Sequence, residues 1–110
     1  MKSNNLIAKF EGIEIVTDGI SDLYYDENGG LNRIKDYRND WGALMGVVEK
    51  INTMDDFNYS VSINYHYTSI ADNNTLYDIV DVDADGDTQK GCYKAVVEFI
   101  KWYNKQQHES

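Results

Sequence analysis

Residues 57–67 read FNYSVSINYHY, and this stretch decides the fold because apolar and polar side chains alternate along its whole length. Alternation with a period of two places the two sets of side chains on opposite faces of a strand. The set expected to face the core comprises Phe57, Tyr59, Val61, Ile63, Tyr65 and Tyr67. The sequence therefore predicts one long strand that is buried on a single face.

A shorter strand is expected directly after it. Asp72, Asn73 and Asn74 are residue types that favour turns, and the apolar residues Leu76, Ile79 and Val80 follow them. Two strands joined by a short turn pair in the antiparallel direction, so we expect these two segments to be neighbours in one sheet.

The residues that follow predict a helix over 90–105. At 100° per residue its apolar side chains cover an arc of roughly 220°, which is much wider than the stripe of about 100° on a surface helix. The apolar residues are Cys92, Tyr93, Ala95, Val96, Val97, Phe99, Ile100, Trp102 and Tyr103. This helix is expected either to be covered on two sides within the fold or to contribute to a homo-oligomer interface. The tail after Asn104 is expected to fray.

A second main helix is predicted over about 40–53. Asn39 or Asp40 can cap its start, and the apolar residues recur at spacings of three and four. These residues are Trp41, Leu44, Met45, Val48 and Ile51. The helix therefore has one apolar face for the core.

The N-terminal third predicts smaller elements. Asn4 or Asn5 can cap a short helix that reaches Phe10, and Gly12 suits the left-handed position that ends a helix. Residues 13–16 are expected to form a strand. Residues 23–25 and 31–34 are expected to form a hairpin around the Asn-Gly pair within 26–30.

Together these elements predict a single α+β domain over residues 1–110. A small antiparallel sheet of three or four strands should pack against the two main helices, with a short N-terminal helix beside them. The residues expected in the core are Trp41, Leu44, Val48, Val61, Ile63, Val97 and Ile100.

The charge is strongly uneven. The net charge is −9, and no lysine or arginine occurs between Lys50 and Lys90. The same interval holds eight aspartates, namely Asp55, Asp56, Asp72, Asp78, Asp81, Asp83, Asp85 and Asp87. Such a surface repels nucleic acid and anionic membranes, and it favours cations or basic protein surfaces. Direct binding of DNA or RNA is not expected.

Residues 81–87 read DVDADGD, which resembles half of a calcium-binding loop. Asp81, Asp83, Asp85 and Asp87 are the candidate metal ligands, and a glycine stands at the sharp-turn position. The loop lacks the bidentate glutamate, because Cys92 stands at position twelve, so calcium affinity would be weak, on the order of 10⁻⁴ to 10⁻³ M. The alternative is a solvated acidic turn in which the last aspartate or Thr88 caps the helix.

No catalytic constellation is recognisable. The two histidines have no partner at metal-ligand spacing, and no serine or cysteine has an evident histidine partner. Cys92 falls in the apolar pattern of the last helix, where a cysteine acts as a small hydrophobic residue. The N-terminus lacks the apolar segment of a signal peptide, and no apolar stretch is long enough to span a membrane, so a cytoplasmic location is expected.

Three segments resemble a group of small, uncharacterised bacteriophage and Bacteroidota proteins for which no activity is established. They are residues 4–12 (NNLIAKFEG), 37–51 (YRNDWGALMGVVEKI) and 93–105 (YKAVVEFIKWYNK). In that group a second tryptophan and a proline are usual at the positions of Ala43 and Gly46, and the aspartate run is not shared. The resemblance implies a phage or prophage accessory protein that works inside a bacterial cell.

Two functions are consistent with these features. The first is non-covalent binding of a bacterial host protein with a basic surface, such as a nucleic-acid-handling or defence protein whose phosphate sites the aspartates would occupy. The residues expected at that interface are Tyr65, Tyr67, Asp72, Asp78, Asp81 and Asp83. The second is a divalent-cation domain that uses the run at 81–87. Neither hypothesis requires an enzymatic activity or a cofactor beyond weakly bound calcium.

Overall fold

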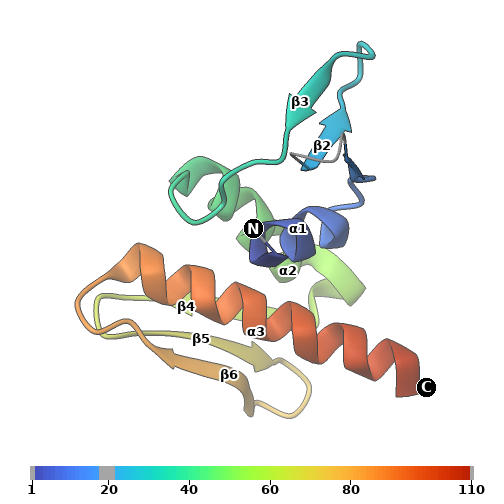
Figure 1. The fold of residues 1–110 in the computed structure, drawn as a ribbon. Helices are drawn as coiled ribbons and strands as arrows, with labels where there is room; N and C mark the ends of the chain where they lie inside the picture. Colours follow the sequence, from blue (N-terminus) through green and yellow to red (C-terminus); the bar gives the residue numbers. More distant parts are fainter. Residues whose placement is uncertain (1, 18–21, 110) are drawn as a thin grey trace.

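The computed structural model describes residues 2–17 and 22–109, which fold into an α+β structure with three helices and two antiparallel sheets of three strands each (Figure 1). The elements are α1 (Lys2–Phe10), β1 (Val16–Thr17), β2 (Asp22–Tyr25), β3 (Leu31–Arg33), α2 (Trp41–Phe57), β4 (Tyr59–Ile63), β5 (Tyr67–Asp72), β6 (Asp78–Asp83) and α3 (Thr88–Glu109). The predicted fold class is confirmed. The strands belong to two sheets, however, rather than to the single sheet that the sequence predicted.

The second sheet has the order β4-β5-β6 and forms the framework of the fold. Val61 lies opposite Ile70, which lies opposite Val80, so one face is apolar across all three strands. Helix α3 packs on β5 and β6, and α2 packs on β4. The other face, called the open face below, consists of Ser60, Ser62, Tyr67, Ser69, Ala71, Asp81 and Asp83.

Helix α3 has a wide apolar arc because it is covered on two sides within the fold. The second sheet lies against one side, and α1 and α2 lie against the other (Figure 1). Phe99 is fully buried between them, with ring centroids 5.0 Å from Tyr59 and 6.4 Å from Phe10. The first of the two alternatives for this helix is therefore the one observed.

Four of the residues expected in the core are buried, namely Leu44, Val48, Val97 and Ile100. Val61 and Ile63 are partly buried against the same core. The prediction for Trp41 was wrong, because its side chain remains 41% exposed. Trp41 is the first residue of α2, and the first buried residue of this helix is Leu44.

The single long strand predicted over 57–67 is also wrong. Only Tyr59–Ile63 form β4, and the chain then turns at residues 64–66 into β5. The carboxamide oxygen of Asn64 accepts hydrogen bonds from the backbone N–H of His66 at 2.8 Å and of Tyr67 at 2.9 Å. A polar residue in the expected register therefore supplies the turn, and the alternation cannot reveal it.

Two apolar residues that were expected in strands, Phe57 and Leu76, lie outside strands in the structure. Phe57 belongs to the end of α2, which extends beyond the predicted residue 53 through a left-handed turn at residues 55–57. Leu76 lies in the turn before β6 rather than in the strand. Ile79 and Val80 do belong to β6, and the pairing of β5 with β6 is antiparallel as expected.

The helix boundaries follow identifiable caps. Asp40 accepts a hydrogen bond from the N–H of Ala43 at 3.0 Å, and Asp87 accepts one from the N–H of Lys90 at 3.0 Å, so both caps are aspartates. Gly12, with φ of +85°, follows the end of α1 as predicted. Helix α1 begins earlier than predicted, at Lys2, and α3 continues past Asn104 to Glu109.

The first sheet has the order β1-β2-β3 and projects away from the helices (Figure 1). The predicted hairpin is confirmed, with Tyr25 opposite Leu31 across a turn that contains Gly29 at φ of +82°. The strand predicted over 13–16 is reduced to Val16–Thr17. No residue of these three strands is buried within the described part of the chain.

Candidate functional site

The aspartate run begins on the open face of the second sheet. Val80 and Val82 turn toward α3, so the intervening Asp81 and Asp83 stand on the side that no helix covers. Both carboxylates are exposed. The alternation of residues 80–83 thus places two of the candidate residues side by side at the outer strand of the sheet.

The loop after β6 folds back toward the β4–β5 turn. The N–H of Ala84 donates to the carbonyl of His66 at 2.9 Å, and the N–H of Asp85 donates to the Asp83 carboxylate at 2.8 Å. Gly86 has φ of +78°, and a side chain built there would come within 3.2 Å of the Tyr65 hydroxyl. The glycine is therefore required both for the turn and for the close approach of Tyr65.

These contacts form a surface hollow of about 510 Å³, called the acidic hollow below. It is lined by His66, Tyr67, Asp81, Asp83, Asp85 and Gly86. Tyr65 stands beside it, over Gly86, with its ring 5.7 Å from that of His66. The structure thus brings together four of the six residues expected at a partner interface, namely Tyr65, Tyr67, Asp81 and Asp83.

The other two expected interface residues lie at the opposite end of the second sheet. Asp78 pairs with Ala71, and Asp72 ends β5. Asp72 also has a structural role, because its carboxylate accepts hydrogen bonds from the N–H of Asn74 at 2.8 Å and of Thr75 at 3.3 Å. The predicted interface therefore extends along the whole sheet instead of converging at one point.

The four candidate metal ligands do not converge either. Asp87 caps α3, whereas Asp81, Asp83 and Asp85 line the acidic hollow. Across residues 2–17 and 22–109, no group of three or more histidine, cysteine, aspartate or glutamate side chains is arranged to hold a metal ion. The calcium hypothesis remains a prediction that this geometry does not support.

Lys90 and Lys94 border the aspartate run on the α3 side. They line an adjoining hollow together with Asp83, Ala84, Asp85 and Asp87. Sequence reasoning missed them as neighbours of the site, although the helix period puts residues 90 and 94 on one face. Asp81 lines the acidic hollow but not the adjoining hollow that contains these two lysines.

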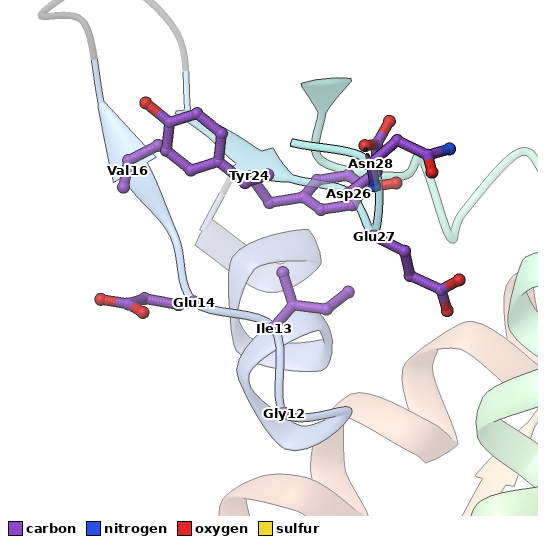
Figure 2. Close-up of a pocket in the computed structure, with 9 residues that line it drawn as sticks. Gly12, Ile13, Glu14, Val16, Tyr24, Asp26, Glu27 and Asn28 are labelled. Carbon is purple, nitrogen blue, oxygen red and sulfur yellow. Dashed lines mark hydrogen bonds between the residues drawn. The ribbon is translucent and has the colours of Figure 1, made fainter. Parts of the chain in front are cut away.

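A third hollow, of about 820 Å³, lies between the segment after α1 and the β2–β3 hairpin. Figure 2 shows Ile13 directed toward the hairpin, and the carboxylates of Glu14 and Glu27 directed away from it. The carboxylate of Asp26 is occupied by the hairpin turn, where it accepts hydrogen bonds from the N–H groups of Asn28 and Gly30. This hollow offers an apolar floor and an acidic rim, but no evident nucleophile and base.

Cys92 cannot serve as an accessible nucleophile. Its side chain is fully buried, and burial raises the pKa of the thiol to about 12. Because the thiolate is the reactive form, the neutral thiol in this position is chemically quiet. This agrees with the prediction that Cys92 acts as a small hydrophobic residue of α3.

Comparisons with protein-family models, with curated proteins and with solved structures gave no match to this chain. In the part of the chain that the structure describes, no helix has the length and apolar character of a membrane span.

Proposed function

We propose that this chain is a small protein-binding module that carries out no chemistry of its own. In this proposal it engages the basic surface of a bacterial host protein through the open face and outer strand of its second sheet. The partner would be a nucleic-acid-handling or defence protein, and the chain would act as a phage or prophage accessory protein inside the bacterial cell.

One observation carries the proposal. Residues 51–89, which contain no lysine or arginine, build the entire second sheet and both of its turns. All ten lysines and arginines lie outside this interval. The charge asymmetry of the sequence therefore becomes a spatial one, because the strands and turns of this sheet carry no positive side chain and Lys90 and Lys94 of α3 border it only beside Asp83 and the loop that follows.

The chemistry of that surface suits a basic protein. Its exposed carboxylates at Asp78, Asp81 and Asp83 attract lysine and arginine over long range, which accelerates encounter more than it strengthens the final complex. The tyrosines at 65 and 67 are 64% and 43% exposed, and tyrosine is a frequent energetic anchor in protein interfaces. The resemblance of residues 37–51 and 93–105 to phage proteins suggests a host protein as the partner.

The proposal is tested by capture of partners from a lysate of the bacterial host with the tagged chain. We expect a host protein with a basic surface to be retained at low salt and released as the Debye length falls below about 8 Å. The combined variant Asp78→Lys, Asp81→Lys and Asp83→Lys should lose the captured protein, with a fall in the association rate that exceeds the rise in the dissociation rate.

A matched variant separates surface position from total charge. Glu14→Lys, Glu27→Lys and Glu49→Lys change the net charge equally but at exposed positions away from the second sheet. Retention of the partner by this control and its loss from the first variant would support the proposal. Equal loss from both variants, or turnover of a substrate by the purified chain, would refute it.

A further inference from the structure

Three large apolar side chains are exposed on two hydrogen-bonded segments at the end of the second sheet opposite the acidic hollow. Phe57 is 67% exposed, Leu76 is 81% exposed and Tyr77 is 78% exposed. We call these three residues the apolar corner. They come from two segments, the end of α2 and the β5–β6 turn, which are joined by hydrogen bonds from Asn73 to the carbonyls of Phe57 at 2.8 Å and Asn58 at 2.7 Å.

The backbone at the apolar corner is unusual in the same way on both segments. Phe57 has φ of +61° and Leu76 has φ of +65°, and the turn that leads to Phe57 is left-handed from Asp55 onward. For residues with a Cβ atom, a left-handed backbone conformation has an energetic cost, so glycine or asparagine normally occupies such positions. Both segments therefore combine a strained backbone with an exposed apolar side chain, and neither feature stabilises the isolated chain.

The apolar corner is nevertheless held in place. Leu76 donates its N–H to the carbonyl of Asp72 at 2.7 Å, and Asp72 donates its own N–H to the carbonyl of Tyr77 at 2.9 Å. The side chains of Asn58 and Asn74 are also hydrogen-bonded to each other. Strained positions that surrounding contacts fix in one conformation occur preferentially at binding sites.

We propose that the apolar corner is the docking point for an apolar patch on a basic protein surface. The inference rests on the proposed function and locates the contact that anchors the complex. Single exposed apolar side chains are ordinary, but a cluster of them rimmed by polar groups marks an interaction site. Here the rim is acidic, because Asp55, Asp56, Asp72 and Asp78 stand on the same two segments and no lysine or arginine lies between residues 51 and 89.

The acidic rim selects the occupant. A second copy of this chain would bring like charges together around the apolar corner, which opposes self-association. A small apolar ligand would need a concave site, and the hollows described above are lined by other residues. A protein segment with an apolar centre and a lysine- or arginine-rich border satisfies both the apolar residues and their rim.

The test uses two helical peptides of equal length and charge, one of leucine and lysine and one of serine and lysine. The leucine peptide should bind at least about tenfold more tightly, because it alone can bury the exposed side chains. In NMR titrations it should shift the amide signals of residues 57–58 and 73–77. If the two peptides bind equally, or if those signals do not move, the apolar corner is not the docking point.

Leu76→Gly separates binding from folding, because glycine relieves the left-handed backbone while removing the apolar group. We expect the melting temperature to be unchanged or to rise by a few degrees, and the leucine peptide to lose its advantage over the serine peptide. Tyr25→Ser with Leu31→Ser, which changes two apolar residues that are 63% and 51% exposed on the hairpin, should leave that advantage intact. The opposite pattern would overturn the inference.

The same titration distinguishes this inference from the proposed function. If both peptides bind with equal affinity, the acidic surface is the binding element; the proposal that the apolar corner is the docking point is then refuted, and the proposed function is not. If neither peptide binds, the proposed function itself, recognition of a basic protein surface, is refuted.

Discussion

The two sheets have the same number of strands and the same antiparallel pairing, but they differ in what covers them. The second sheet packs one face against α2 and α3, and Tyr59, Ile70 and Val80 are buried there. The first sheet buries no residue of its strands in the described part of the chain. Turn chemistry is therefore sufficient to shape a hairpin, whereas a stable sheet requires burial of one face.

Hydrogen bonds connect the first sheet and the segments that flank it to the body, and Ile13, Ile15 and Ile34 of those segments are only partly buried against the core. Asn5 of α1 donates to the carboxylate of Asp22 at 2.5 Å, and the buried Tyr37, which follows the hairpin, donates its hydroxyl to Glu11 at 2.5 Å. Regions with few buried apolar contacts open locally at lower free energy than the core. We expect the first sheet to open independently while the second opens only with global unfolding.

Among the substitutions that test this difference, Phe99→Ala should have the largest effect on stability. Phe99 is fully buried and contacts the rings of Tyr59, Phe10 and Tyr103, so its truncation leaves a cavity at the centre of the second sheet's core. The free energy of unfolding, measured by urea denaturation, should fall by about 3 to 5 kcal/mol.

Leu31→Ala is the matched substitution in the first sheet. Leu31 is 51% exposed, so the same measurement should change by less than about 0.5 kcal/mol. A loss at Leu31 comparable to the loss at Phe99 would show that both sheets belong to one cooperative core.

An effect between those at Phe99 and Leu31 is expected at Gly91, near the start of α3. A methyl group added there would come within 2.6 Å of the Ala84 Cβ and 2.7 Å of its Cα, so the loop after β6 would have to move. Gly91→Ala should lower the free energy of unfolding by about 1 to 3 kcal/mol. It should also perturb the NMR signals of the acidic hollow, which that loop forms.

Gly46→Ala provides the control for helix propensity. Gly46 lies inside α2, and an added methyl group would meet nothing within 4 Å. This substitution should raise the free energy of unfolding by about 0.5 to 1 kcal/mol in the same denaturation experiment. Stabilisation by both substitutions would mean that the packing of α3 against Ala84 is looser than the structure indicates.

The smallest effect concerns the hairpin and pH. Hydrogen bonds from the Asn32 side chain and then from the backbone of Gly30 and Asn28 lower the pKa of Asp26 below its ordinary value of 3.8. Because the folded pKa is lower than the unfolded one, this contribution is present above that ordinary value and is lost as pH falls through the folded pKa. As pH falls through the folded pKa of Asp26, the amides of residues 28 and 30 should therefore lose protection, measured as their exchange rate relative to an unstructured amide at the same pH, before the amides of β5 do. Simultaneous loss of protection in both sheets would contradict local opening.

The sequence predicted the local features of the fold well, because each depends on a few neighbouring residues. Asn39 or Asp40 was expected to cap α2, Gly12 to end α1 and the Asn28-Gly29 pair to turn the hairpin; in the structure Asp40 is the cap, and the other two features are as expected. These features have short-range causes in hydrogen bonding and in backbone freedom.

The misplaced elements had no local signal. Asn64 breaks the predicted strand, yet it stands in the polar register that the alternation already required. Leu76 lies in a turn with positive φ, but its apolar side chain indicated a strand. The candidate site was therefore predicted only in part. Asp81, Asp83 and Tyr67 were expected at the interface, whereas the residues of the apolar corner were expected in strands because nothing in the neighbouring sequence indicated their turns.

The most direct test of the proposed function uses the same contrast between the two sheets. Hydrogen exchange of the chain should be measured by mass spectrometry with and without the host protein captured by it. We expect the partner to slow exchange in residues 57–83, which span the second sheet and the apolar corner, and to leave residues 22–33 of the hairpin unchanged. Protection confined to residues 22–33, with none in 57–83, would contradict binding through the second sheet.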